Sequence, residues 1–255
     1  MHDSASMRLD SVTVDFGGLR ALSNVSIEIN PGEVVGIIGP NGAGKTTLFN
    51  VLSGLVTPTS GTFYIGGSLR DWPKPHELTG LGIARTLQGV GLFSDLTVNE
   101  NLLVGAAHVE KDNFFRSLLG LDRNKQLHLY EQAQDLLAEL HISEYAKSTA
   151  SSLPYPISKR VALARALMCE PTTLLLDEPA GGLGADDISW LKDFVLRFRS
   201  EKSVLLVEHH MDVIMNVCDR IYVLNFGQLI AHGTPEEIKH NPEVIAAYLG
   251  SEAQA

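Results

Sequence analysis

Positive charge is scarce in this sequence. Its 255 residues include 20 lysines and arginines against 30 aspartates and glutamates, which gives a formal net charge of −10. Nucleic acids and anionic membrane surfaces are bound through basic faces. The charge balance therefore argues against broad electrostatic binding to either, and we expect no nucleic-acid partner.

Cysteines and long apolar runs are scarce as well. Cys169 and Cys218 are the only cysteines and lie far apart, so a metal cluster or a disulfide framework is not expected. The low cysteine content instead suggests a reducing compartment. No apolar run approaches the roughly 18 residues that a membrane span needs. The first four residues do not resemble a secretory signal. We expect a soluble, intracellular chain whose 44% hydrophobic content suffices for a core.

A glycine-rich loop is the most informative pattern that the sequence does contain. Its residues follow the Gly-x-x-x-x-Gly-Lys-Thr spacing of phosphate-binding loops and are Gly39, Pro40, Asn41, Gly42, Ala43, Gly44, Lys45, Thr46 and Thr47. In such a loop the backbone N–H groups point at phosphate oxygens. Lys45 is expected to reach the β- and γ-phosphates, and the Thr46 hydroxyl to ligate Mg²⁺. The chain is predicted to bind a nucleoside triphosphate.

The flanks of the loop support this interpretation over a chance match. Before it, Glu33 is followed by Val34, Val35, Gly36, Ile37 and Ile38, which suits a buried parallel strand. After it, Leu48, Val51, Leu52 and Leu55 recur at i, i+3, i+4 and i+7, the spacing of one helix face. Strand, loop and helix stand in the order that a phosphate-binding loop requires.

The remaining patterns predict an α/β fold. Three segments alternate like strands of an antiparallel sheet, namely 9–14, 25–29 and 62–65. Residues 99–150 show helical periodicity, which predicts a helical subdomain. Three later apolar runs suit a parallel sheet, namely 173–176, 204–207 and 221–224. Residues 225–228 predict a hairpin turn, and Thr234-Pro235-Glu236-Glu237 begins a helix that is expected to close the chain.

Polar residues follow two of the predicted core strands. Asp177 and Glu178 end the first, and His209 follows the second. Asp177 can hold Mg²⁺ through water, and Glu178 is placed to polarise a water that attacks the γ-phosphate. His209 is predicted to orient that water. The alternatives are a surface Asp-Glu turn and a structural histidine.

Together these motifs resemble the ATPase subunit of an ATP-binding cassette transporter, over essentially the whole chain. Residues 84–88, 92–102 and 233–250 are similar to those of the branched-chain amino-acid importers. The resemblance implies a P-loop NTPase, RecA-like core with an N-terminal antiparallel β part (8–87), a helical subdomain (88–168) and a second core part (169–255), all in one domain spanning 1–255. It also implies that Phe16 stacks on adenine, and that Gln88 touches Mg²⁺ or the attacking water and links the site to the membrane subunit.

The sequence departs from that family at two places. Where the family has Leu-Ser-Gly-Gly-Gln or Leu-Ser-Tyr-Gly-Gln, a signature that clamps the γ-phosphate held by the opposite subunit, this chain has Leu153, Pro154, Tyr155, Pro156 and Ile157. The prolines replace a hydroxyl and a backbone N–H donor. Three serines could supply a substitute hydroxyl, namely Ser158, Ser151 and Ser152. The second departure is Gly184, where the family usually has Asn or Asp.

The motifs and the family resemblance together imply an Mg²⁺-dependent ATPase subunit of an importer for branched-chain amino acids or a similar small polar solute. We expect an asymmetric heterodimer with a second ATPase subunit, two transmembrane permeases and, indirectly, an extracytoplasmic solute-binding protein, at the cytoplasmic face of the cell membrane. Two alternatives stay open. One is a regulatory or assembly subunit that binds ATP without useful turnover, and the other is an ATPase for lipopolysaccharide extraction. The apolar segment 114–121 is interpreted either as a permease contact or as helix packing within its own subdomain.

Overall fold

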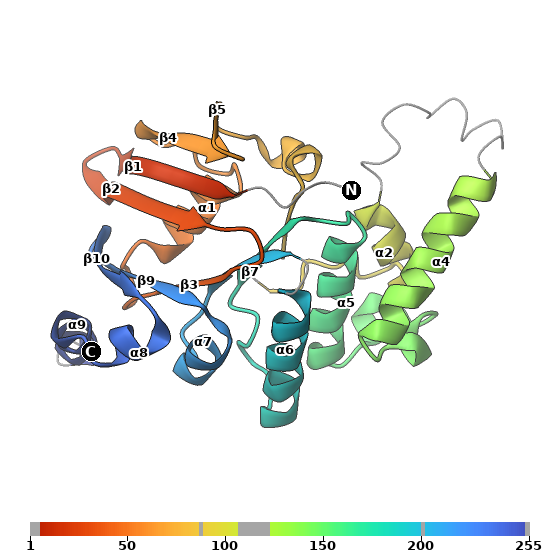
Figure 1. The fold of residues 1–255 in the computed structure, drawn as a ribbon. Helices are drawn as coiled ribbons and strands as arrows, with labels where there is room; N and C mark the ends of the chain where they lie inside the picture. Colours follow the sequence, from red (N-terminus) through yellow and green to blue (C-terminus); the bar gives the residue numbers. More distant parts are fainter. Residues whose placement is uncertain (1–5, 87–88, 107–122, 200–201, 253–255) are drawn as a thin grey trace. The chain divides into compact units, whose positions relative to one another are not determined.

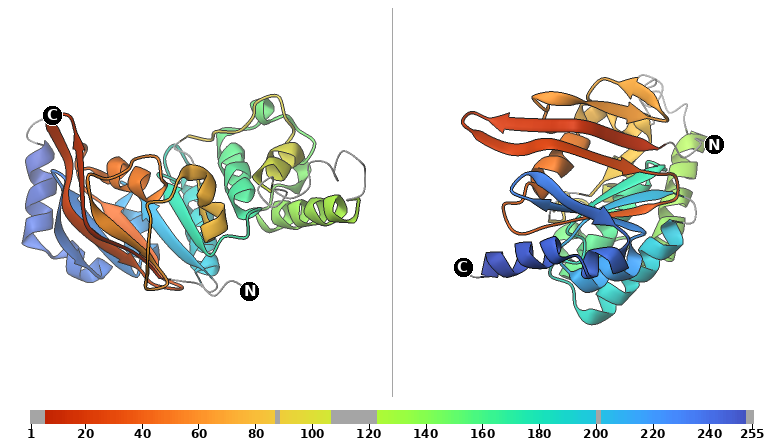
Figure 2. Two further views of the ribbon diagram at one scale, coloured as in Figure 1. Left: turned by 90° about the horizontal axis from the view of Figure 1, so that it is seen from above. Right: turned by 60° about the vertical axis from the view of Figure 1, so that its left-hand side comes forward.

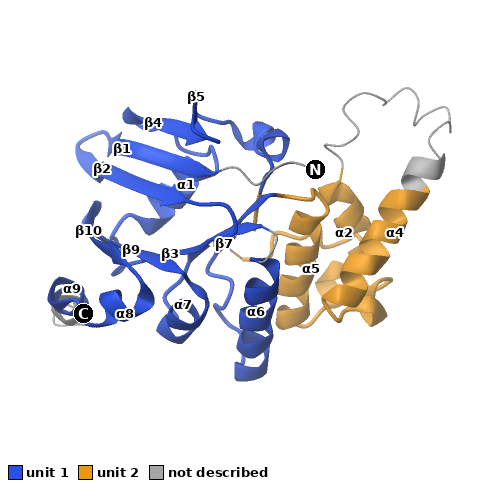
Figure 3. Ribbon diagram, viewed as in Figure 1, with its two compact units in different colours: residues 1–83, 172–255 blue, residues 84–171 orange. Residues whose placement is uncertain are grey.

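The computed structural model describes residues 6–86, 89–106, 123–199 and 202–252. The chain divides into two compact units (Figure 3). Unit 1 comprises Met1–Ile83 and Thr172–Ala255, and unit 2 comprises Ala84–Pro171. The predicted division at 87/88 and 168/169 stays a prediction, and the apolar segment 114–121 lies outside the described residues.

Unit 1 contains a four-stranded antiparallel sheet, as the alternating segments predict. Its strands are β1 (Met7–Phe16), β2 (Leu19–Ile29), β4 (Ser60–Ile65) and β5 (Ser68–Arg70). Their order in the sheet is β2-β1-β4-β5. Along β1 the residues Leu9, Val12 and Val14 are buried, so one face of this sheet packs against the core.

A six-stranded sheet with the order β10-β9-β3-β8-β7-β6 forms the centre of the fold. Its strands are β3 (Val34–Ile38), β6 (Ile83–Arg85), β7 (Thr173–Asp177), β8 (Ser203–Val207), β9 (Arg220–Asn225) and β10 (Gln228–Gly233). The pairs β3·β8, β3·β9 and β7·β8 are parallel, and β10 is antiparallel to β9. All residues of β3, β7 and β8 are buried, which explains why apolar residues make up most of each strand.

One hydrophobic core joins the two sheets through helix α1 (Lys45–Leu52). Residues of β1, β2, α1, β4 and the parallel strands belong to the same buried cluster, and α1 lies between the sheets (Figures 1 and 2). Helices α6 (Ala185–Phe198) and α7 (Met211–Val217) cover the other face of the parallel sheet (Figure 1). At Gly36 of β3 a Cβ atom would lie 2.8 Å from the Cys218 Sγ, so α7 can approach β3 because residue 36 has no side chain.

The predicted helical stripe after the phosphate loop is wrong at its last member. Helix α1 ends at Leu52, and Leu55 lies beyond it with 55% of its surface exposed. Gly54 adopts a left-handed φ of +69°, the conformation with which glycine commonly ends a helix. The i+7 position therefore never forms on this helix.

The C-terminal part contains two helices, so the prediction of one closing helix is wrong. Helix α8 (Pro235–Lys239) starts with the expected Thr234 capping box, and α9 (Pro242–Glu252) follows it. Proline disfavours helical geometry in the residue before it and offers no N–H. The Asn241 Oδ1 accepts the Glu243 N–H at 2.9 Å, which starts the second helix.

The described part of unit 2 is helical, as predicted. Its α-helices are α2 (Val98–Gly105), α4 (Arg123–Glu139) and α5 (Tyr155–Leu167), and its 3-10 helices are Ser143–Tyr145 and Ala150–Ser152. Two further 3-10 helices belong to unit 1, namely Pro75–Glu77 and Thr79–Leu81. Leu137 of α4 is fully buried, in line with the helical periodicity of 99–150. Within the described ranges, no helix combines the length and apolarity required to cross a bilayer.

Candidate nucleotide site

The glycine-rich loop connects the end of β3 to the first turn of α1. Gly39, Gly42 and Gly44 all have positive φ. A Cβ atom at Gly44 would lie 2.8 Å from the Ala21 carbonyl oxygen, so this position requires glycine both for its conformation and for its packing. The loop therefore ends at the N-terminus of α1, where free N–H groups and the helix dipole favour an anion.

Lys45 folds back over this loop. Its Nζ donates to the Gly39 carbonyl oxygen at 2.7 Å and to the Pro40 carbonyl oxygen at 2.9 Å. Partial burial lowers the pKa of the Lys45 ammonium, and the negative charge of Glu178 opposes that shift. The lysine of the loop and the carboxylate after β7 are thus close enough to interact, although 133 positions separate them in the sequence.

Oxygen atoms suited to a divalent cation lie at the same edge of the sheet. Thr46 is exposed in the first turn of α1, and Asp177 is the buried last residue of β7. Because β3 and β7 both pair in parallel with β8, their carboxyl ends meet at one edge. A hydroxyl and a carboxylate are the oxygen ligands that Mg²⁺ prefers, usually with several waters retained. The residues present fit the predicted ion.

Glu178 and His209 come together beyond the ends of β7 and β8. The Glu178 Oε1 lies 3.9 Å from the His209 Nδ1, and both side chains are partly exposed, at 36% and 56%. Glu178 has a φ of +46°, which is uncommon for a residue with a side chain and is often found at functional sites. The two side chains that are predicted to act on the attacking water thus lie close together, although they follow different strands.

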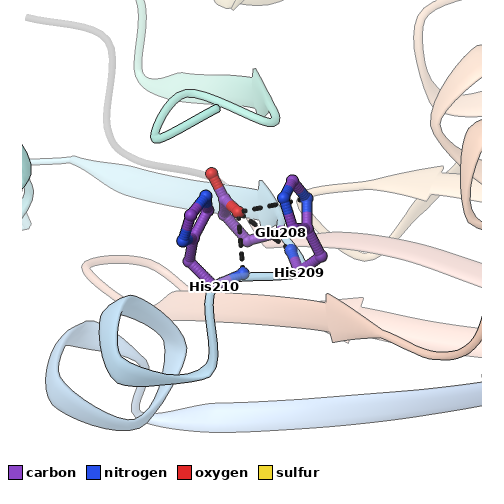
Figure 4. A group of neighbouring side chains, drawn as sticks. All are labelled: Glu208, His209 and His210. Carbon is purple, nitrogen blue, oxygen red and sulfur yellow. Dashed lines mark hydrogen bonds and ion pairs between the residues drawn. The ribbon is translucent and has the colours of Figure 1, made fainter. Parts of the chain in front are cut away.

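Glu208 is a residue of this site to which the sequence assigns no role. Its side chain is fully buried, and its carboxylate accepts the backbone N–H groups of His209 and His210 at 2.8 and 3.1 Å (Figure 4). It also accepts the backbone N–H of Ala180 at 2.6 Å. A glutamate directly after an apolar strand is a visible signal. Nothing in the sequence distinguishes a buried glutamate there from an exposed one.

Glu208, His209 and His210 also have the residue types of a metal site. Their potential ligand atoms all lie within 4.8 Å of one another. However, the carboxylate oxygens of Glu208 already accept three amide hydrogens, and these N–H groups compete with a cation for the same lone pairs. The geometry therefore favours an anchoring carboxylate over a ligand.

Phe16 and Gln88 complete the predicted nucleotide contacts. Phe16 is the last residue of β1, pairs with Leu19 and exposes 50% of its surface, so its ring is open to a planar ligand. Gln88 lies outside the described residues.

The divergent signature lies in unit 2, at the start of α5. Pro154 is the N-cap and Pro156 the second helical residue, positions that tolerate proline because the first N–H groups of a helix have no partner within it. The Ser158 hydroxyl donates to the Pro154 carbonyl at 3.3 Å, and this serine is buried. Ser152 donates to the Thr149 carbonyl. Two of the three candidate substitute hydroxyls are therefore already engaged.

Gly184, the second departure, is the N-cap of α6. A Cβ atom there would meet nothing within 4 Å, and its backbone has the extended conformation common at N-caps. The local structure does not require glycine at this position.

Two family models match this chain. Residues 22–181 match the family model described as ABC transporter. Residues 228–254 match a second model, described as Branched-chain amino acid ATP-binding cassette transporter. The chain belongs to the ABC transporter family, as an ATP-hydrolysing subunit of the branched-chain amino-acid type.

Individual relatives cover nearly the whole chain. It is 40% identical over 248 residues to the high-affinity branched-chain amino acid transport ATP-binding protein LivG of Escherichia coli, covering 96% of this chain and 97% of the relative. The same identity and coverage hold for the protein BraF of Pseudomonas aeruginosa, which has the same description.

Solved structures give the same result for the fold. A nucleotide-free ATP-binding cassette from an ABC transporter superimposes with a TM-score of 0.83 at 33% identity, covering 96% of this chain and 98% of the other. An ATP-binding cassette in its ADP conformation superimposes with a TM-score of 0.84 at 31% identity, covering 96% and 99%. The predicted fold class is confirmed.

Proposed function

We propose that this chain energises the import of branched-chain amino acids or a similar small polar solute by hydrolysing ATP at the edge of its parallel sheet. The observation that carries the chemistry is the convergence of Lys45, Glu178 and His209, which come from three separate segments. The descriptions of LivG and BraF as branched-chain amino acid transport proteins support the choice of solute.

The proposed roles follow from the position of each side chain. Backbone N–H groups of 39–47 and the Lys45 ammonium hold the phosphates, and the Phe16 ring carries the adenine. Glu178 takes a proton from the attacking water, and His209 orients that water toward the γ-phosphate. These assignments rest on the family resemblance together with the geometry. The assignment of Gln88 as a contact to the ion or the water rests on the resemblance alone.

Thr46 and Asp177 are the residues that would hold Mg²⁺, with Gln88 as a third candidate. The chemistry that a bound Mg²⁺ would supply is neutralisation of the negative charge on the phosphate oxygens. The contribution of the chain is to present a hydroxyl and a carboxylate at one edge of a rigid sheet.

The proposed assembly is an asymmetric heterodimer with a second ATPase subunit, bound to two permeases at the cytoplasmic face of the membrane. Pro154 and Pro156 lack backbone N–H groups, so the start of α5 offers fewer donors to a phosphate than a serine and a glycine would. A partner with an unbroken signature would complete the site around Lys45, and the reciprocal site would turn over slowly.

A Glu178→Gln variant tests the catalytic assignment. Within the complex purified through a tag on this chain, we expect ATP hydrolysis to fall by about a hundredfold or more, because a general base contributes about 10²- to 10⁴-fold. ATP binding should be retained. The control is Glu131→Gln, an exposed carboxylate on α4 in the other unit. An unchanged rate in Glu178→Gln would contradict the role of Glu178.

The same purification tests the assembly. Co-purification of a second ATPase and two permeases supports the heterodimer, whereas a lone chain or a homodimer favours the regulatory alternative. Uptake of labelled leucine in cells that lack this chain tests the solute. Normal leucine uptake with impaired lipopolysaccharide delivery would favour the extraction ATPase.

A further inference from the structure

Glu208 directly follows β8 and is the buried carboxylate of unit 1 that no proposed catalytic step uses. Its side chain has no exposed surface. Among the described residues, His209 alone approaches it at ion-pair distance, with 3.7 Å between Nδ1 and Oε2. The carboxylate therefore depends mainly on backbone N–H groups for the hydrogen bonds that it loses when it leaves water.

Those N–H groups come from two different segments. The Oε1 accepts from Ala180, in the turn that follows β7, and the Oε2 accepts from His209 and His210, in the segment that follows β8. A carboxylate that accepts several amide hydrogens forms charge-assisted bonds, which are shorter and stronger than neutral ones. One side chain thus ties together the backbone segments that carry Glu178 and His209.

The turn after β7 needs such an anchor. Glu178 has a positive φ, which persists in a residue with a side chain only when the surroundings enforce it. Its own N–H donates to the Val207 carbonyl at 2.8 Å, and the Gly181 N–H donates to the Glu178 carbonyl at 3.1 Å. The bond from Ala180 to Glu208 fixes the turn on the other side of Pro179.

Stability alone does not explain a glutamate at this position. Replacing a buried charge by a well-packed apolar residue is often neutral or stabilising. An apolar residue at 208 would leave three backbone N–H groups without this acceptor, two of them beside His209. The Glu208 carboxylate with its three N–H donors is therefore suited to holding the backbone after β7 and β8 in one conformation.

We propose that Glu208 is a positioning residue for ATP hydrolysis. Its buried carboxylate sets the separation between Glu178 and His209 by fixing the two backbone segments that carry them. Figure 4 shows the bonds to the segment that carries His209. The carboxylate does not itself reach substrate, since it is fully buried and surrounded by amides. This inference rests on the roles proposed above for Glu178 and His209.

The principal test is a Glu208→Gln variant of the purified transporter complex. Glutamine keeps the shape but replaces one acceptor oxygen by an NH₂ group, which must then face at least one backbone N–H. We expect kcat to fall by about ten- to a hundredfold, as for a small misplacement of catalytic groups, with the KM for ATP changed less than about twofold.

Ser203→Ala is the matched control. Ser203 lies at the opposite end of β8, is buried, accepts the Gly32 N–H and donates to the Asn30 carbonyl. Its removal therefore deletes buried hydrogen bonds on the same strand but away from Glu178. A kcat of Glu208→Gln equal to that of Ser203→Ala would overturn the positioning role.

Glu208→Asp keeps the charge with a shorter reach, and we expect it to recover part of the lost kcat. It also provides the test if Glu208→Gln does not fold, in which case a kcat equal to wild type would overturn the inference.

A double variant separates this inference from the proposed function. If Glu208 acts through Glu178, adding Glu208→Gln to Glu178→Gln should lower the residual rate by less than about twofold, because coupled residues are not additive. Full multiplication of the two effects would overturn the inference. A normal rate in Glu178→Gln alone would instead refute the role of Glu178.

Discussion

The start of α5 offers the most direct test of the proposed asymmetry, through the double substitution Pro154→Ser and Pro156→Gly. Pro154 occupies the N-cap with φ −57° and ψ 145°, a conformation in which serine accepts an N–H from the first turn. We expect this change to stabilise the helix by about 1 kcal/mol. Replacing Pro156 by glycine raises the conformational entropy of the unfolded chain, which lowers the free energy of unfolding by about 1–2 kcal/mol.

These two effects nearly cancel, so the fold should change little. The expected net loss is at most about 1 kcal/mol, or roughly 2–4 °C in the melting temperature of a chain of this size. Function should change more, because a hydroxyl and two N–H groups are added where a phosphate would bind. One donor to a charged oxygen contributes about 1.5 kcal/mol, which corresponds to about a tenfold effect at that site.

The assay is ATP turnover by the complex purified with its partners, compared at 25 °C. We expect turnover to rise several-fold. The control is Pro154→Ala with Pro156→Ala, which restores the N–H groups without the hydroxyl and should give a smaller increase. Turnover identical to wild type, in a variant whose melting temperature is preserved, would refute the idea that these prolines weaken a hydrolytic site.

Two further predictions concern unit 1. Burial raises the pKa of the Tyr248 hydroxyl, and a hydrogen bond with the Gly39 backbone lowers it. Tyr248→Phe should therefore cost about 1–3 kcal/mol in urea unfolding and weaken ATP binding, whereas Tyr130→Phe, an exposed tyrosine of unit 2, should change neither measurement. Burial, aided by the charge of Asp219, strongly raises the pKa of the Cys218 thiol. The unfolded thiol loses its proton first, so stability should fall as pH rises above about 8.5, by at most about 1.4 kcal/mol per unit. Cys218→Ala should remove this component of the pH dependence between pH 7.5 and 9.5, and identical slopes for the two proteins would contradict it.

The parts of the site that follow from sequence are those that local rules determine. The loop around Lys45 is a contiguous motif. A run of apolar residues indicates the strand before it, and apolar residues at helical spacing indicate the helix after it. Asp177 and His209 are recognisable as polar residues that end or follow apolar core strands. Each of these inferences needs only short-range pattern and general topology.

Tertiary contacts were outside the reach of such rules. The burial of Glu208 depends on the turn at Ala180, 28 residues earlier. The contact of Tyr248 with Gly39 joins residues near opposite ends of unit 1. Leu55 matched the helical spacing, yet Gly54 ends the helix before that position. In the first two cases a contact between residues far apart in the sequence decides the outcome. In the third, the backbone conformation of one glycine overrides the local helical spacing.

Glu178 and Glu208 show most directly why burial must be known before roles are assigned. Each glutamate immediately follows an apolar core strand, and the two strands are hydrogen-bonded neighbours. Sequence position alone makes them equivalent candidates for a general base. In the fold, Glu178 turns through a positive φ and remains 36% exposed, whereas Glu208 is fully buried among amide donors. A base must reach water and accept its proton, which the first can do and the second cannot. The same residue type at matching positions thus separates into a group suited to chemistry and a group suited to holding it in place.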